Sequence, residues 1–190
     1  MKGKTVTTLD KIQPVLEALP DNLKRIIQGM PFTILKDLEE IRIREMRPLM
    51  VYSHGRDYFI SDDGNPVLNP AEAYHVSPRD TQRILQLMAD FSIYAIEEEI
   101  RNGYITLRGG YRVGLAGKAV MDGENLKTLK YINTFNIRIT REIWGAANKV
   151  LPYIINNGRV LHTLILSPPQ MGKTTLIRDI IRQLSDGFPG

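Results

Sequence analysis

The amino-acid sequence predicts two parts: an α+β module over residues 1–145, and a linker helix with the beginning of an α/β domain over residues 146–190. In the first part, helical stripes and strand patterns come in blocks, rather than as a repeating strand–helix unit. In the second part, an apolar run, a short loop and an amphipathic helix follow one another directly. The change in pattern near residue 160 therefore separates two kinds of architecture.

The module opens with two short helices. Leu16 and Leu19 belong to the first, and Pro20-Asp21-Asn22 starts a second helix that ends near Gly29. Apolar and charged residues then alternate strictly over residues 40–44, which predicts a half-buried strand. Two further strands are expected over residues 49–52 and 58–60, and a loop over residues 62–70.

A strong helix start follows at Ser77-Pro78-Arg79-Asp80, where serine can cap the helix and Asp80 can return the cap. The apolar stripe of this helix runs to Phe91, and a second stripe ends at Asn102-Gly103. Strands are then expected over residues 104–108, 111–121 and 126–139, the first two joined by a two-residue turn at Gly109-Gly110. A last helical stripe of the module connects Trp144, Ala147, Leu151 and Ile154.

Composition excludes several classes of function. The 25 basic and 21 acidic residues are too balanced to indicate nucleic-acid binding, so no direct nucleic-acid partner is expected. The chain has no cysteine, which removes disulfides, thiolate zinc sites and cysteine nucleophiles. Neither a signal peptide nor an apolar run of about 18 residues is present, so we expect no membrane insertion, and any membrane role requires a partner.

The residues that carry chemistry come after residue 160. The apolar run over residues 160–166 predicts a strand buried on both faces of a parallel sheet, and a helix begins near Lys173 and ends at Gly187. Between them lies a loop with the pattern of a phosphate-binding P-loop. The candidate binding residues are Ser167, Pro168, Pro169, Gln170, Met171, Gly172, Lys173, Thr174 and Thr175.

Each position has a physical role in gripping a polyphosphate with backbone amides at a helix N-terminus. Gly172 allows close approach of the backbone, Lys173 reaches the β- and γ-phosphates, and the Thr174 hydroxyl ligates Mg²⁺. Lys173 and Thr174 are therefore the candidate catalytic residues, and Thr174 is the candidate metal ligand. The usual pattern begins with glycine, and here Ser167 stands in that place, with Pro168-Pro169 restricting φ after it.

The segment Leu166–Arg182 (LSPPQMGKTTLIRDIIR) resembles the phosphate loop of the stage III sporulation protein AA family, ATPases of spore-forming bacteria that are similar to type II secretion and type IV pilus motors. The resemblance also covers residues 38–49, the segment GGYRVGLAG at residues 109–117, and residues 132–142. It thus extends over most of the chain.

The resemblance implies an ATP-binding subunit of a hexameric, RecA-like motor in the mother-cell cytoplasm, with ATP and Mg²⁺ as cofactors. It implies self-association and partners among the membrane channel proteins between mother cell and forespore, with the motor powering or assembling that channel. The motor domain is expected to be truncated, because a complete P-loop domain needs on the order of 150 residues. We therefore expect this chain to hydrolyse ATP poorly.

The resemblance also suggests a role for two arginines near the junction. In related motors an N-terminal arginine meets nucleotide at a subunit interface, which would fit Arg138 and Arg141. Ordinary salt bridges or a solvated face are the simpler interpretation of these side chains.

Three other functions remain open at this stage. The module could be a non-enzymatic assembly or docking domain. A small phosphotransferase is disfavoured because the loop lies near the end of the sequence. Single-stranded nucleic-acid binding through Tyr104 and Tyr111 would need a clustered aromatic platform.

Overall fold

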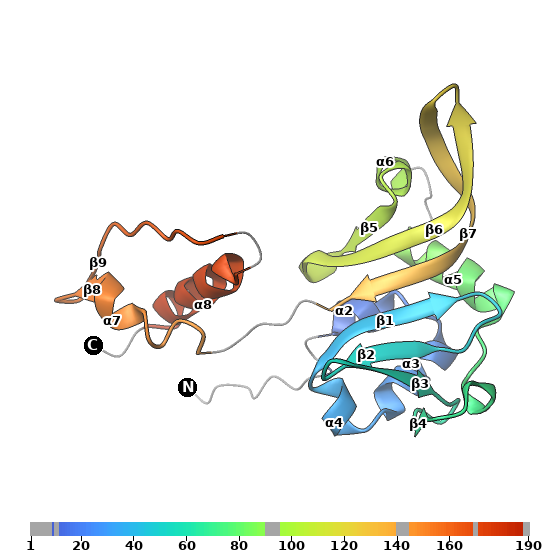
Figure 1. The fold of residues 1–190 in the computed structure, drawn as a ribbon, viewed down its shortest axis with the longest axis horizontal. Coiled ribbons are helices and arrows are strands. Elements are labelled where there is room, and N and C mark those ends of the chain that lie inside the picture. Colours follow the sequence, from blue (N-terminus) through green and yellow to red (C-terminus); the bar gives the residue numbers. More distant parts are fainter. Residues whose placement is uncertain (1–8, 10–11, 90–95, 140–144, 169–170, 188–190) are drawn as a thin grey trace. The chain divides into compact units, whose positions relative to one another are not determined.

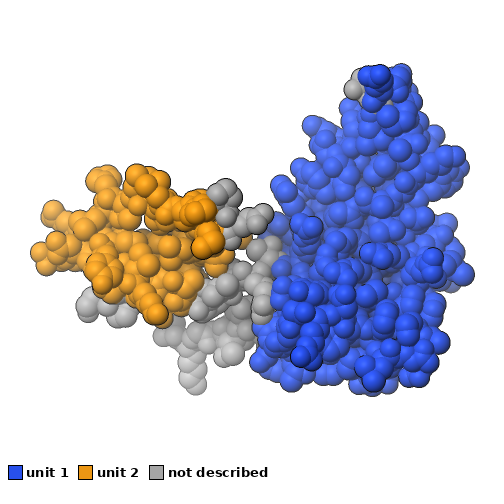
Figure 2. Space-filling model, viewed as in Figure 1, with its two compact units in different colours: residues 1–140 blue, residues 141–190 orange. Residues whose placement is uncertain are grey.

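The computed structural model describes residues 9, 12–89, 96–139, 145–168 and 171–187. The chain divides into two compact units, unit 1 over residues 1–140 and unit 2 over residues 141–190 (Figure 2). The fold is mixed α/β with one large antiparallel sheet, which confirms the α+β character predicted for the first part (Figure 1). Within the described ranges, no helix combines the length and the apolar composition that crossing a bilayer demands.

Unit 1 contains the seven-stranded sheet, in the order β4-β3-β2-β1-β7-β6-β5. Every neighbouring pair of strands is antiparallel. The strands are β1 (Leu38–Arg44), β2 (Met50–Ser53), β3 (Arg56–Ile60), β4 (Pro66–Val67), β5 (Tyr104–Leu107), β6 (Tyr111–Asp122) and β7 (Asn125–Arg138). The helices are α2 (Gln13–Glu17), α3 (Asp21–Gly29), α4 (Phe32–Leu35), α5 (Pro78–Met88) and α6 (Glu97–Arg101), with 3-10 turns η1 (Pro70–Glu72) and η3 (Arg108–Gly110).

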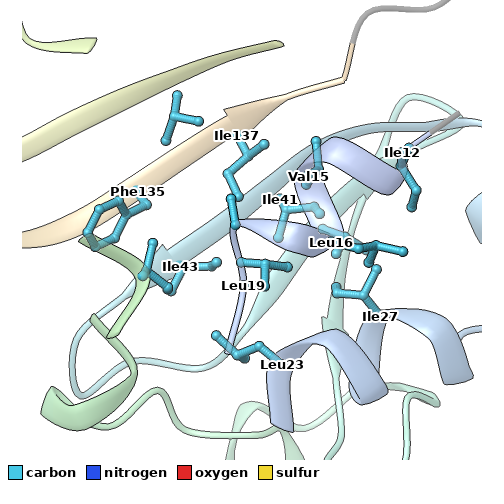
Figure 3. Packing of buried hydrophobic residues seen from close by; sticks show 14 of the residues in the cluster. Ile12, Val15, Leu16, Leu19, Leu23, Ile27, Ile41, Ile43, Phe135 and Ile137 are labelled. Carbon is cyan, nitrogen blue, oxygen red and sulfur yellow. The ribbon is translucent and has the colours of Figure 1, made fainter. Parts of the chain in front are cut away.

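The core of unit 1 lies on one face of this sheet. Figure 3 shows apolar side chains of α2 and α3 packed toward those of β1 and β7. Alternation places Ile41, Ile43, Phe135 and Ile137 in this core, all of them fully buried. The strict alternation at residues 40–44 is therefore confirmed as a half-buried strand.

The predicted start of α5 is confirmed in its atomic detail. The Ser77 side chain accepts a hydrogen bond from the Asp80 amide at 3.3 Å, and the Asp80 carboxylate accepts one from the Ser77 amide at 2.8 Å. The same carboxylate accepts hydrogen bonds from Tyr74 and Asn22. Burial, reinforced by this contact with Asp80, raises the pKa of Tyr74 to about 12. Asp80 thus ties the helix start to α3 and to the segment before α5.

Several local expectations were wrong. The β5–β6 hairpin pairs Leu107 with Tyr111, so its loop has three residues and includes Arg108, because the backbone of Gly109 turns at φ +82° inside a 3-10 turn. Helix α7 (Leu151–Ile154) is only four residues long, preceded by turns over residues 145–150, and Trp144 lies outside the described residues. Residues 62–70 were expected to be a loop but include β4, which pairs with β3.

The predicted parallel strand over residues 160–166 is not formed. In unit 2, β9 (Arg159–Val160) pairs antiparallel with β8 (Ile155–Asn156), and residues 161–168 have no regular structure. Leu164 and Leu166 are 81% and 82% exposed. The Leu161 amide still donates to the Ile154 carbonyl at 2.8 Å, but among the described residues no strand lies beside residues 162–166, so no sheet buries their side chains. The beginning of a P-loop sheet is therefore absent from this structure.

On the other face of the sheet in unit 1, the described side chains are half-buried or exposed. We define the open face by the residues that alternate with the core positions and are half-buried or exposed: Glu40, Arg42, Arg44, Tyr52, Asp57, Arg112, Thr134, Asn136 and Arg138. Strands β6 and β7 also continue beyond their other neighbours, because β5 pairs only as far as Gly114 and β1 only as far as Thr134. We call residues 117–131 the arm, a hairpin that projects from the sheet in Figure 1.

Candidate phosphate-binding loop

The loop leading into α8 (Lys173–Ser185) turns at Gly172, which stands at the N-cap with φ +78° and ψ 14°. This left-handed backbone conformation favours glycine. A Cβ built on Gly172 would have nothing within 4 Å, so the protein leaves the space above this turn open. The predicted glycine therefore has a conformational reason for its position, and its surroundings would admit a ligand's approach to the backbone.

Lys173 is the first residue of α8, and its side chain folds back over the loop. The Lys173 Nζ donates a hydrogen bond to the Ser167 carbonyl oxygen at 2.8 Å. This contact joins the first position of the predicted loop to its lysine. The structure thus holds the Lys173 ammonium group beside the backbone of the first loop residue.

The N-terminus of α8 has no side-chain cap. The first backbone hydrogen bond of the helix runs from the Leu176 amide to the Gly172 carbonyl at 2.9 Å. The amides of Lys173, Thr174 and Thr175 precede that bond, so they remain donors at the positive end of a 13-residue helix. Thr174 is exposed and Thr175 is half-buried. This terminus can supply several main-chain donors and one hydroxyl to an anion.

Serine is accommodated at the first loop position without strain. Ser167 is absent from the residues with positive φ, so this place does not require the conformational freedom of glycine. The Ser167 hydroxyl donates to the Pro168 carbonyl oxygen at 3.2 Å. Met171 is exposed, whereas Pro169 and Gln170 lie outside the described residues.

A buried carboxylate fixes α8 to the rest of unit 2. Asp179 is 5% exposed and accepts hydrogen bonds from the Ala147 amide at 2.8 Å and from Gln183 at 2.9 Å. Arg182 donates to its other oxygen from two nitrogens, at 3.1 and 2.7 Å. Beside this network, Leu176, Ile180 and Leu184 pack against Ala147, Leu151 and Ile154. Sequence reasoning missed Asp179, although a single carboxylate within an apolar helix stripe is a signal that could have indicated it.

Acid should weaken this attachment of α8. The hydrogen bond from the Ala147 amide, helped by Arg182 and Gln183, lowers the pKa of Asp179 to about 2. Because the folded pKa lies below the ordinary value of about 3.9, the carboxylate stabilises unit 2 fully above about pH 4. That contribution is lost as pH falls through about 2. We expect the NMR amide signals of α8 to change in this window, and Asp179→Asn to remove the dependence.

The control for this prediction lies on the same helix. Asp186 also contacts Arg182, at 3.0 Å, but its side chain is 63% exposed. We expect Asp186→Asn to leave the pH response of the α8 amides essentially unchanged. An unaltered response in Asp179→Asn would contradict the assignment.

The described residues contain no group of three or more histidine, cysteine, aspartate or glutamate side chains that could hold a metal ion. In unit 2 the described carboxylates are Asp179 and Asp186, and both are paired with Arg182. The exposed Thr174 hydroxyl at the helix terminus is compatible with Mg²⁺ held jointly by protein and phosphate oxygens. Of the two arginines proposed to meet nucleotide, Arg138 ends β7 in unit 1, and Arg141 lies outside the described residues.

The amino-acid sequence is similar to a known protein family. The family model described as "Sporulation stage III, protein AA" matches residues 9–189. A curated protein of Bacillus subtilis (strain 168), "Stage III sporulation protein AA", is 39% identical over 173 residues. That match covers 91% of this chain and 52% of the relative, so the chain spans about half the length of the relative. No solved structure matches the chain.

Proposed function

The chain belongs to the sporulation stage III protein AA family, and we propose that it acts in sporulation as the ATP-binding part of a secretion-type motor subunit. The observation that carries the proposal is the loop from Ser167 to Thr175, with its left-handed glycine, its lysine at the helix start and its uncapped helix N-terminus. These features supply main-chain donors and a fixed positive charge, which a polyphosphate requires.

In this proposal each described residue has a limited role. Gly172 keeps the approach to the backbone open, and the first-turn amides of α8 bind phosphate oxygens. Lys173 exchanges its contact with the Ser167 carbonyl for the phosphate chain, and Thr174 contributes a hydroxyl to Mg²⁺. Mg²⁺ would neutralise the charge of the phosphates. The choice of ATP rather than GTP rests on the family resemblance alone.

We further propose that this 190-residue chain binds nucleotide but turns it over poorly. Both described carboxylates of unit 2 are engaged by Arg182, so neither is available to polarise a water molecule. A neighbouring subunit of a hexameric, RecA-like assembly would have to complete the site. Ordinary steady-state ATPase turnover by the purified chain would overturn this part of the proposal.

Titration with Mg²⁺-ATP, followed by calorimetry, tests the proposal directly. We expect saturable binding of ATP that requires Mg²⁺ and is much weaker for AMP, because AMP lacks the β- and γ-phosphates. Absence of any uptake would remove the motor interpretation and leave the assembly role as the candidate function.

The assembly role is favoured independently by unit 1, whose open face and arm carry exposed charged side chains such as Arg112, Lys118 and Lys130. In the proposed setting, the mother-cell cytoplasm beneath a channel to the forespore, such a surface would contact other subunits or channel proteins. Nucleotide binding and assembly are compatible, since they use different units of the chain.

A further inference from the structure

The ribbon formed by β6 and β7 places like charges directly opposite one another at two levels. Arg112 pairs with Arg138 across the strands, and Lys118 pairs with Lys130. Cross-strand partners have Cβ atoms about 5 Å apart, where like charges destabilise a sheet. Two such pairs on one ribbon indicate a surface that is adapted to something anionic.

Other described side chains do not neutralise these pairs. Arg112 lies over the Tyr104 ring, 4.8 Å from its centroid, which leaves its charge in place. The nearest carboxylate across β1 from Arg138 is Glu40, and Glu40 is already paired with Arg42 at 2.7 Å. Within the described part of the chain, neither Arg112 nor Arg138 makes a salt bridge.

The open face beside Arg138 also holds an unsatisfied acceptor. The side-chain oxygen of Asn136 is buried, and no described residue donates a hydrogen bond to it. Its cross-strand neighbour on β6 is Gly114, which contributes no side chain to cover it. Buried acceptors are nearly always paired, so this oxygen marks a local weakness in the hydrogen bonding of the sheet beside Arg138.

The tip of the arm carries the opposite charge. Among the charged residues of the ribbon, Asp122 and Glu124 lie at the tip and are exposed, whereas all the others are basic. These others are Arg112, Lys118, Lys127, Lys130 and Arg138. Ten residues separate Arg112 from Asp122, which is about 30 Å along an extended strand. The acidic tip therefore cannot reach the basic pair of its own ribbon.

From this charge separation we propose that the acidic arm tip of one copy docks on the open face of a second copy, against Arg112 and Arg138. The contact is head-to-tail, because the tip and the basic pair are different surfaces of each copy, and repeated contacts of this kind close into rings or continue as filaments. The proposal deepens the self-association included in the proposed function by naming the surfaces that meet.

The pattern favours a protein partner over a polyanion. Glu40 and Asp57 share the open face with the arginines, and the tip that leads the arm is acidic. A nucleic acid or an anionic membrane would be repelled at these positions, because both present a continuous negative surface. Alternating patches of opposite sign are typical of interfaces between proteins.

Charge reversal in the 190-residue chain, without nucleotide, tests the contact by sedimentation equilibrium. We expect self-association that weakens with salt and falls at least about tenfold in Arg112→Glu/Arg138→Glu. Asp122→Lys/Glu124→Lys should cause a similar loss, and a mixture of the two variants should associate again. As the control, Arg25→Glu/Arg79→Glu changes the same net charge at exposed positions on α3 and α5 and should leave association unchanged.

Cross-linking supplies a second readout that does not depend on stability. The natural chain has no cysteine, so Arg112→Cys/Glu124→Cys introduces the only two thiols. A disulfide requires Cα atoms within about 7 Å, which the separation of about 30 Å forbids within one ribbon. Oxidation should therefore give covalent oligomers, whereas a chain with Arg79→Cys/Glu124→Cys should remain largely monomeric.

Several outcomes would overturn the proposal. Association that survives both reversals and strengthens with salt would come instead from the exposed apolar side chains of unit 2, such as Leu164 and Ile181. Binding of a single-stranded oligonucleotide or of phosphatidylserine vesicles, lost in Arg112→Glu/Arg138→Glu while self-association persists, would assign the face to a polyanion. Because ATP titration of these variants reports unit 2 separately, failure of the arm contact remains distinguishable from failure of nucleotide binding.

Discussion

Replacing Lys173 by alanine is expected to weaken Mg²⁺-ATP binding by roughly ten- to a hundredfold. The side chain contributes a charged hydrogen-bond donor to the phosphates, and such a bond contributes about 1.5–3 kcal/mol. Its present contact with the Ser167 carbonyl at 2.8 Å shows that the ammonium group already lies beside the loop. The measurement is calorimetric titration of the wild-type and variant chains at matched ionic strength.

Two further variants test whether the loss of ATP binding is specific to the loop. Lys149 is exposed in unit 2 but lies outside the loop, so Lys149→Ala removes the same charge and should bind ATP as the wild type does. Thr174→Ala should reduce the dependence on Mg²⁺ more than the affinity for the nucleotide alone. Equal losses of ATP affinity in Lys173→Ala and Lys149→Ala would indicate general electrostatic attraction and not a specific phosphate-binding site.

Replacing Phe135 by alanine is expected to lower the free energy of unfolding of unit 1 by about 3–5 kcal/mol. Phe135 is the largest fully buried side chain among the described residues and lies near the end of β7, in the core shown in Figure 3. Its removal loses both the transfer free energy of the ring and the packing around the cavity that remains. Urea unfolding followed by circular dichroism should show an earlier midpoint, and a fall of the melting temperature by 10 °C or more is on the order expected.

The matched control is Phe32, which has the same side chain but is 68% exposed at the start of α4. Phe32→Ala should change the free energy of unfolding by no more than about 0.5 kcal/mol. Similar effects of the two substitutions would mean that the packing around Phe135 is not the main support of the sheet.

The sequence was sufficient to predict those elements of unit 1 that depend only on residues close together in the chain. Alternation over residues 40–44 depends only on which side chains face a core, and the cap at Ser77 depends only on residues three apart. The apolar run over residues 160–166 was misread because a buried strand depends on neighbours that the pattern itself does not contain. Helix α7 was overestimated for a related reason, since the turns over residues 145–150 also bury Ala147.

The loop was predictable in part for the same physical reason. The turn at Gly172 and the helix start at Lys173 depend on residues close in the sequence, so both could be predicted from it. Asp179 accepts a hydrogen bond from the amide of Ala147, which lies 32 residues away in the sequence. The like-charge pairs of the ribbon depend on the register of β6 with β7. Such contacts become visible only once the strands and helices are placed.

The irregular segment over residues 161–168 leads directly into the loop, so its accessibility can be used to follow the state of the loop. An irregular segment whose leucines lie in solvent is accessible to endopeptidases. Leu164 and Leu166 lie directly before the residues proposed to enclose a phosphate chain, so a bound nucleotide would hinder a protease at the neighbouring peptide bonds. The rate of proteolysis at these leucines would therefore report whether the loop holds nucleotide.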